Sequence, residues 1–283
     1  MINKLKIIMV QNKNLFQSLC IHIVQKLKRR NIHKLNYFQS LYVNLCFLPF
    51  KDAIKMPILI YGKCTFYALS GNVKFKVPIK RGMLKIGAND PVRSYYSKSF
   101  LSVNGEFVVG NNVTLRRGIN LEIKKNAVLE LEDNVSIGHN CTIIVAKNVC
   151  IKQATSIGNN TTIMDTDFHY IINVKSRNVK PSEGKILIHE NCWIGGNCII
   201  KKNTILPKGT ILAGPYSMVS KDYTKIIPEF SIIAGSPAKL LVEDMRRINN
   251  NETDAILADY FSNTSEPYQF DANIDMEKIC MPN

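Results

Sequence analysis

The chain has 283 residues, 46% of them hydrophobic, and is therefore long enough to bury a substantial core in one or two domains. Its net charge of +15 is concentrated at one end. Residues 1–100 hold 18 Lys and Arg against two Asp and Glu, whereas the remaining 19 basic and 20 acidic residues nearly cancel. Zinc-finger spacing, RNP-type aromatic motifs and basic zippers are absent from the sequence, so nucleic acid is not an expected partner. An anionic membrane surface or an acidic glycan fits the basic end better.

The sequence contains no run of about 18 uncharged apolar residues, and no apolar segment followed by a small-residue cleavage site. We therefore expect neither a membrane-spanning helix nor a signal peptide. Eight cysteines occur without a C-x-x-C pair, and in the absence of an export signal we expect reduced thiols. These features predict a cytoplasmic protein, for which a peripheral contact with the inner face of the membrane stays open.

Three segments are expected in the basic region 1–100, which we predict to be partly helical and to cap the rest of the fold. Residues 1–46 mix apolar and basic side chains, as suits a helix on an anionic membrane or, equally, a helical cap or subunit contact. Residues 47–57 resemble a short basic helical turn between prolines. Strand-like stretches at Ile58–Tyr61, Gly71–Val77 and Met83–Gly87 then predict an irregular first coil.

Large aliphatic residues recur at every sixth position near the middle of the chain. The longest run is Ile188, Ile194, Ile200, Leu206, Leu212 and Met218. Three shorter runs precede it: Val109–Leu115–Leu121, Leu131–Ile137–Ile143 and Ile151–Ile157–Ile163. Small residues follow four positions later, including Cys141, Thr155, Thr161, Cys192, Cys198, Thr204 and Thr210. Asparagine recurs in another register, at Asn191, Asn197 and Asn203.

A period of six predicts a parallel β-helix over residues 101–242. Each step of six supplies one short strand and a turn, and three steps complete a triangular coil whose aliphatic residues point to the axis. A β-sandwich would instead show a period of two. Between the shorter runs the step lengthens to ten or eight residues, which predicts coils enlarged by four and two residues. The fold class expected is therefore an all-β solenoid.

The stretch Ile186–Leu241 closely resembles the left-handed hexapeptide-repeat acyltransferases. Its ending, Ile233-Ala234-Gly235-Ser236-Pro237-Ala238-Lys239, is similar to the segment that closes the β-helix of galactoside, maltose and polysaccharide O-acetyltransferases. The resemblance covers about residues 100–242. It implies left-handed winding, although parallel crossovers are normally right-handed. It also implies a homotrimer that transfers an acetyl group from acetyl-coenzyme A to a hydroxyl of a cell-surface glycan or its precursor.

One long interruption of the repeat carries a histidine. Ile163 and Ile188 lie 25 residues apart where one step needs six, so about 19 residues, within the loop 164–186, are extruded. Histidine titrates near neutral pH, and a neighbouring carboxylate can orient it. We therefore predict His169 as a general base, with Asp167 or Asp165 as its partner. In the resembling transferases a histidine in this loop deprotonates the acceptor hydroxyl.

The same resemblance implies further contacts. Coenzyme A would lie between neighbouring β-helices, beside Gly195, Gly196, Ala213 and Gly214, with its phosphates near Lys221 and Lys239. Arg246 and Arg247 lie at the same end and are expected to be ordinary surface charges. Trp193, the only tryptophan, is expected to face outward, where with Phe168 it would contact the acceptor or, alternatively, pack against a neighbouring subunit. A backbone N–H near Gly195 and Gly196 is expected to stabilise the oxyanion.

Alternatives from other classes remain open. A zinc site through His139, His169 and His189 would suit a γ-carbonic-anhydrase-like enzyme, but spacings of 30 and 20 residues lack the close histidine pair, so no metal is expected. The chain could also acetylate a small molecule, or serve as a silent scaffold. Residues 243–283 are predicted to begin with a short helix and continue as a polar tail.

Overall fold

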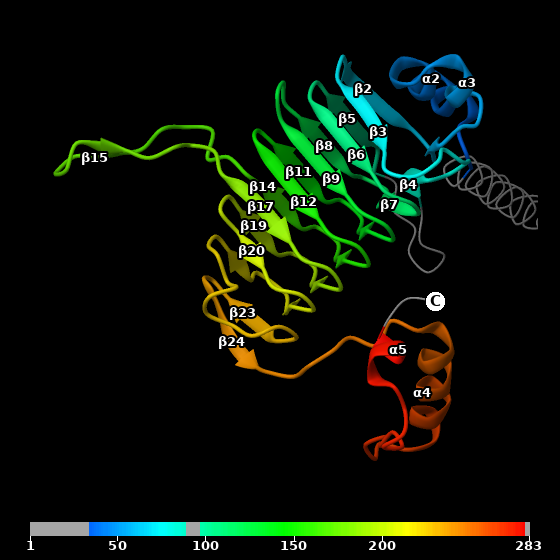
Figure 1. Ribbon diagram of the computed structural model, residues 1–283, viewed down its shortest axis with the longest axis vertical. Helices are drawn as coiled ribbons and strands as arrows, with labels where there is room; N and C mark the ends of the chain where they lie inside the picture. Colours follow the sequence, from blue (N-terminus) through cyan, green and yellow to red (C-terminus); the bar gives the residue numbers. More distant parts are fainter. Residues whose placement is uncertain (1–33, 89–96, 281–283) are drawn as a thin grey trace, which may run out of the picture.

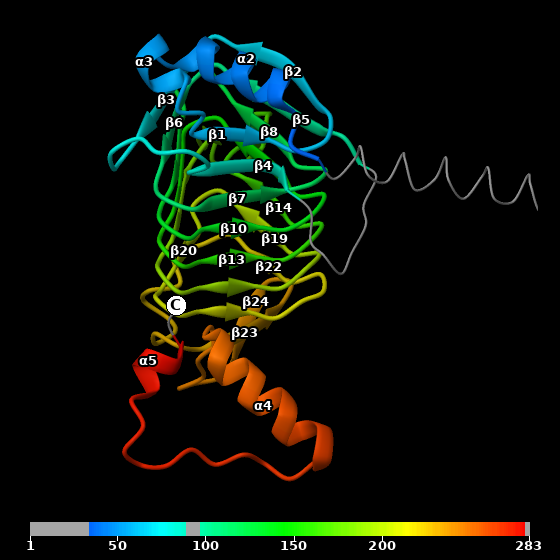
Figure 2. The ribbon, with the colours of Figure 1, turned by 90° about the vertical axis from the view of Figure 1, so that its right-hand side faces the viewer.

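The computed structural model describes residues 34–88 and 97–280. Most of them form a parallel β-helix, in which three sheets share one axis and each coil adds one strand to every sheet (Figures 1 and 2). Sheet 1 contains β1 (Ile58–Ile60), β4 (Leu84–Ala88), β7 (Val113–Arg116), β10 (Ser136–Ile137), β13 (Ser156–Ile157), β18 (Trp193–Ile194), β21 (Ile211–Leu212), β23 (Ile232–Gly235) and β24 (Ala238–Val242). The predicted all-β solenoid is thus confirmed as a parallel β-helix.

The other two sheets run beside the first. Sheet 2 contains β2 (Cys64–Leu69), β5 (Ser99–Val103), β8 (Asn120–Ile123), β11 (Thr142–Val145), β14 (Thr162–Met164), β19 (Ile199–Lys201) and β22 (Met218–Val219). Sheet 3 contains β3 (Asn72–Phe75), β6 (Glu106–Val109), β9 (Val128–Leu131), β12 (Asn148–Ile151), β17 (Lys185–Ile188) and β20 (Ile205–Leu206). The chain passes from sheet 1 to 2 to 3 and back, so the coil has three corners.

The aliphatic repeat forms the core. The predicted axial residues of the long run are fully buried from Ile188 to Leu212, and those of the shorter runs are buried as well. The prediction is wrong at Met218, which is only partly buried, because Val219 takes the axial place. Val219 is the register partner of Ile200, although a regular coil such as that from Ile194 to Leu212 would end one position earlier, at Met218. The turn between sheets 1 and 2 therefore holds one extra residue in this coil.

The predicted enlarged coils are present. Leu115 is the register partner of Ile137, and Ile137 is that of Ile157, so both of these coils are longer than the regular coil from Ile194 to Leu212. The recurrent asparagines occupy the turns, where Asn191, Asn197 and Asn203 have φ of 59°, 58° and 66°. Asparagine tolerates this left-handed conformation better than other residues with a side chain, which explains its recurrence.

The β-helix starts earlier than the predicted residue 101. Its first strand is β1, and β1 and β4 join β7 in the same sheet. The early strands are long, and a register shift interrupts the pairing of β2 with β5 and of β4 with β7. These irregularities obscure the period of six, and the segments expected to form an irregular first coil are continuous with the regular ones.

Two helices cover the first coil, α2 (Tyr37–Phe47) and α3 (Phe50–Ala53) (Figure 2). Val43 of α2 is fully buried and belongs to the main core cluster. Residues 1–33 lie outside the described part of the chain, so the predictions made for them, including a helix on a membrane, stay predictions. Within the described residues, no helix is long and apolar enough to span a bilayer.

The C-terminal part differs from the prediction that residues 243–283 begin with a short helix. β24 turns back antiparallel to β23 and extends to Val242, so this segment is strand, and residues 243–250 are not helical. Helix α4 (Asn251–Asn263) begins only where the Asn250 side chain accepts hydrogen bonds from the Glu252 and Thr253 amides, an N-cap interaction. A second short helix, α5 (Met276–Cys280), follows in the polar segment.

Candidate active site

The long interruption of the repeat forms an arm that projects from the β-helix (Figure 1). Ile157 and Ile194 are register partners across it, so this coil takes about twice the chain length of the regular coil from Ile194 to Leu212. The outer part of the extruded segment is a short antiparallel hairpin of β15 (Ile172–Asn173) and β16 (Asn178–Val179). The arm leaves from the corner between sheets 2 and 3, which we call the arm corner.

Asp165 fastens the base of the arm to the preceding coil. Its fully buried carboxylate accepts hydrogen bonds from the amides of Ala146, Lys147 and Asn148, at 2.6, 2.8 and 2.8 Å. Its main-chain oxygen accepts from Gly184 N at 2.9 Å, which joins the two sides of the arm. These contacts give Asp165 an anchoring task in place of the predicted one of orienting His169.

The carboxylate of Asp167 is engaged by two lysines. Its carboxylate forms ion pairs with Lys202 at 2.8 Å and Lys201 at 3.4 Å, and the hydrogen bond from Lys202 lowers its pKa. Asp167 N donates to Ser182 O at 2.8 Å, and Asp167 O accepts from His169 N at 2.7 Å. Asp167 therefore helps to join residues 165–167 to residues 182–184, the two segments that we call the neck of the arm. It contacts His169 through the main chain.

His169 lies just beyond this neck with its side chain exposed. The preceding Phe168 has φ of 62°, an uncommon conformation for a bulky residue, and its ring lies 4.8 Å from Lys124 Nζ. His169 and Asp167 border a hollow of about 570 Å³, within the size range of ligand sites. Polar and apolar side chains of the arm line the rest of it, among them Ile172, Asn173, Ser176 and Asn178.

The predicted coenzyme A residues lie at a different corner, between sheets 1 and 2, which we call the glycine corner. A Cβ on Gly195 would lie 2.5 Å from Gly214 N, and one on Gly214 would lie 2.5 Å from Gly196 O, so close stacking of the coils requires glycine there. The amides of Gly196 and Gly214 donate no hydrogen bond to any described residue, and Gly214 is exposed. Both amides thus lack a partner within the described part of the chain, and Gly196 is partly exposed.

The two predicted phosphate-binding lysines lie at two different corners. Lys239 is the register partner of Ala234 in the β23–β24 hairpin. The next residue of this hairpin, Gly235, donates its N–H to Ser217 Oγ, which in turn donates to Ala213 O. Lys239 therefore lies near the glycine corner. Lys221 lies at the arm corner, where its carbonyl accepts from Ile205 N. The amide of Ala213 donates to Ile233 O at 2.9 Å, so this amide, unlike that of Gly214, is not free to bind a ligand.

Trp193 lies on sheet 1, on the outer face of β18, and is 43% exposed. The guanidinium of Arg247, from the segment before α4, lies 5.2 Å from the indole ring, and burial lowers the pKa of this arginine. Arg246 stacks at 3.7 Å on Phe230. The arginines expected to be ordinary surface charges thus pack on aromatic rings, and the Trp193 ring already contacts its own chain.

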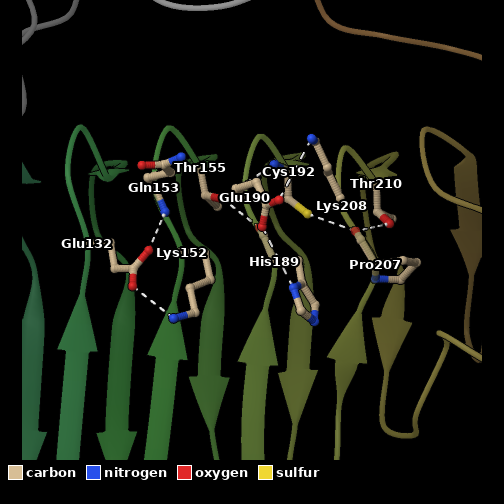
Figure 3. Close-up of polar contacts among 10 residues, drawn as sticks. All are labelled: Glu132, Lys152, Gln153, Thr155, His189, Glu190, Cys192, Pro207, Lys208 and Thr210. Atoms are coloured by element: carbon tan, nitrogen blue, oxygen red, sulfur yellow. Dashed lines mark hydrogen bonds and ion pairs between the residues drawn. The ribbon is translucent and has the colours of Figure 1, made fainter.

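The third corner, between sheets 3 and 1, holds another histidine (Figure 3). His189 Nδ1 lies 3.7 Å from one carboxylate oxygen of Glu190, whose other oxygen lies 3.8 Å from Lys208 Nζ. His139 is buried at the glycine corner, so the three histidines considered for zinc occupy three different corners of one chain. Among the described residues, no group of three or more potential ligands could hold a metal ion.

Sequence reasoning missed the residues that hold the arm. Lys201 and Lys202 follow Ile200, whose register partner is Ile163, so they lie one coil below the point where the arm begins. The six-residue step fixes this register and could have placed the two lysines under Asp167. The stacking of Arg247 on Trp193 carried no such signal, because the segment after Val242 follows no repeat.

Comparisons with known proteins add the following. No family model matches the chain. An uncharacterized 24.8 kDa protein in the cps region of Klebsiella pneumoniae is 29% identical over 149 residues, which are 52% of this chain and 63% of that relative, so the match spans less than two thirds of its length. Among solved structures, a variant of the Bacillus cereus N-acyltransferase AntD, in complex with dTDP-4-amino-4,6-dideoxyglucose and coenzyme A, aligns at 16% identity and a TM-score of 0.45. That alignment covers 82% of this chain and 100% of AntD. The polysialic acid O-acetyltransferase OatWY aligns at 17% identity and 0.42, covering 70% and 99%.

Proposed function

We propose that this chain is a coenzyme A-dependent O-acetyltransferase, wound as a left-handed β-helix, that acetylates a hydroxyl of a cell-surface glycan or its precursor. The observation that carries the proposal is the arm, which presents the exposed His169 beside a hollow lined by polar side chains. Functional groups concentrate on such loops because a rigid scaffold positions them. Asparagine, serine and lysine side chains along the hollow suit a ligand rich in hydroxyl groups.

In this proposal the chemistry is direct transfer. The imidazole of His169 takes the proton of the acceptor hydroxyl while that oxygen attacks the thioester carbonyl carbon of acetyl-coenzyme A. The carbon–sulfur bond then breaks, and the departing thiolate takes the proton from the imidazolium. In this proposal the amides of Gly196 and Gly214 would donate hydrogen bonds to the thioester portion of the ligand or to the oxyanion. Lys239 supplies a cation near them.

The geometry of one chain favours a site shared between two chains. His169 belongs to the arm corner and Gly196 to the glycine corner, and sheet 2 separates the two corners in each chain. Parallel β-helices packed side by side as a closed homotrimer would bring the arm corner of one chain to the glycine corner of the next. We therefore include the homotrimer in the proposal.

The experiment is release of free coenzyme A from acetyl-coenzyme A by the purified chain, on a panel of sugars, nucleotide sugars and oligosaccharides. We expect acceptor-dependent turnover that falls about 10²- to 10⁴-fold in His169→Ala, the usual range for loss of a general base. His189→Ala is the matched control, because it removes a partly exposed histidine with a carboxylate nearby at another corner. Loss of turnover in His189→Ala alone would move the site to that corner, and failure to bind coenzyme A would reject the function.

The shared site is tested by mixing two inactive chains. Gly196→Val blocks the glycine corner, where an added Cβ would meet Asn159 O at 3.1 Å. His169→Ala removes the proposed general base, the imidazole on the arm. Random trimers of the two variants should regain about a quarter of the active sites, because some arms then meet intact corners. If the mixture is no more active than its separate components, both parts of the site belong to one chain.

A further inference from the structure

Helix α2 presents polar side chains to the β-helix. The Asn44 side chain donates to Ile58 O at 2.8 Å and accepts from Ile58 N at 3.1 Å, and Ser40 Oγ accepts from Ile60 N at 2.8 Å. Gln39 bonds the main chain of Cys64 in the same way, at 2.6 and 3.0 Å. These bonds satisfy the main-chain groups that the outermost strands would otherwise leave open. The inner face of α2 is therefore largely polar.

The outer face of α2 is apolar, which inverts the usual pattern of a surface helix. Phe38 is 90% exposed, and in α3 Phe50 is 72% exposed. The exposed face, which we call the cap face, also includes Tyr37, Leu41, Tyr42, Leu45 and Ile54. Single exposed apolar residues are common, but a cluster of them, as on α2 and the adjoining α3 segment, marks a contact with another surface.

Lysines lie at both ends of the cap face. Lys34 and Lys63 flank one end of α2, where Lys34 O accepts from Gly62 N, and exposed Lys51 and Lys55 lie at the α3 end. Residues 1–51 contain no Asp or Glu, and the first carboxylate, Asp52, is paired with Lys55 at 2.8 Å. A surface of phenylalanine, tyrosine and leucine edged by lysine suits the boundary between lipid headgroups and acyl chains. Anionic headgroups complement the lysines.

We propose that the cap face docks on an anionic lipid bilayer. A second copy of this chain fits less well, because the lysines around each cap face would then be brought against each other. α2 lies across the end of the stacked coils (Figure 2), so a docked chain rises away from the bilayer. In sheet 2 the arm follows β14, four strand spacings from β2, or roughly 19 Å at about 4.8 Å per strand. Given the proposed function, this favours an acceptor attached to lipid.

The first test is co-sedimentation of the full chain with vesicles, without coenzyme A or sugar, so that its outcome is independent of the proposed reaction. Vesicles of phosphatidylcholine and phosphatidylglycerol, mixed at about two to one, should bind the chain, and pure phosphatidylcholine should bind at least tenfold less. The double variant Phe38→Ala and Phe50→Ala should lower the partition coefficient about tenfold or more. Ile256→Ala, an exposed aliphatic residue on α4, is the control and should bind like wild type. Equal binding by wild type and double variant would overturn the proposal.

A second test reports on the cap face itself. Phe38→Trp in a Trp193→Phe background places the only indole of the chain on this face. Anionic vesicles should shift its emission to the blue, and brominated lipids should quench it. Emission that is already blue-shifted and does not respond to vesicles would show that residues 1–33 or a second copy cover the face, which overturns the proposal. Self-association that the double variant of the first test abolishes would identify the second copy as the occupant.

Discussion

The coils and the arm belong to one chain but are stabilised in different ways. In the coils, strands pair on both sides and residues such as Leu129 and Ile143 are fully buried. In the arm, β15 and β16 pair only with each other, and Ile171 and Val174 are 71% and 81% exposed. Hydrophobic burial therefore stabilises the coils, whereas a few polar contacts at the neck hold the arm. Substitutions should separate the two, with stability lost in the coils and function lost in the arm.

The largest expected effect on stability is in the core. Ile143→Ala removes a fully buried side chain from the axial column and leaves a cavity, which should lower the free energy of unfolding by about 2–5 kcal/mol. Ile171→Ala, the matched change in the arm, should alter it by less than about 0.5 kcal/mol. Urea denaturation followed by circular dichroism measures both. Similar losses at the two positions would show that the arm contributes to the core, contrary to the comparison.

An intermediate effect is expected where arm and coil join. Asp165→Asn keeps the size of the side chain but replaces one of its two accepting oxygens with an NH2 donor that faces main-chain amides, which should cost about 2 kcal/mol. Turnover should fall as well, because the base of the arm loses its anchor. Asp133→Asn is the control, since Asp133 accepts from Asn111 N at 2.7 Å in a coil without an arm. The control should lose stability and keep its turnover, and a loss of turnover in both would remove the special role of the arm base.

The same contrast explains what the sequence could predict. The six-residue step identifies the axial residues because a solenoid repeats one packing environment, and each buried position demands an aliphatic residue. The step fails at Met218, where one extra residue in a turn moves Val219 to the axis. It also fails before residue 101, where longer strands and register shifts replace the short strand and turn.

The candidate site was predictable in part, for a related reason. A break in a strict repeat locates the arm and the histidine on it, but side-chain partners depend on which coil lies beside the break. Asp165 and Asp167 both resemble partners of His169 in the sequence, yet one binds main-chain amides and the other binds lysines of the following coil. The cap face could not be predicted from the sequence, because the residue pattern of a helix does not reveal that its polar side bonds the edge of a strand.

A smaller effect on stability than at Asp165 is expected at Asp167. Asp167→Asn removes ion pairs with Lys201 and Lys202 that are partly exposed, so the free energy of unfolding should change by at most about 1 kcal/mol. The neck should nevertheless open more often, because the lysines no longer hold the side chain of Asp167, whose amide bonds Ser182 O across the neck. Hydrogen exchange of the Asp167 and Gly184 amides, which bond Ser182 O and Asp165 O across the neck, measures this opening. Protection there should fall several-fold in the variant, with amides of β11 unchanged.

The pH dependence of this protection has a definite sign. The pKa of Asp167 is lowered in the folded chain by its hydrogen bond with Lys202, so the ion pairs are fully formed above the ordinary aspartate value of about 3.9. Their contribution should be lost as the pH falls through the lowered value. Wild-type protection, corrected for intrinsic exchange, should therefore drop below about pH 4, and the protection of Asp167→Asn should not. A parallel drop in the variant would assign the closure of the neck to other groups and leave Asp167 without a role in positioning the arm.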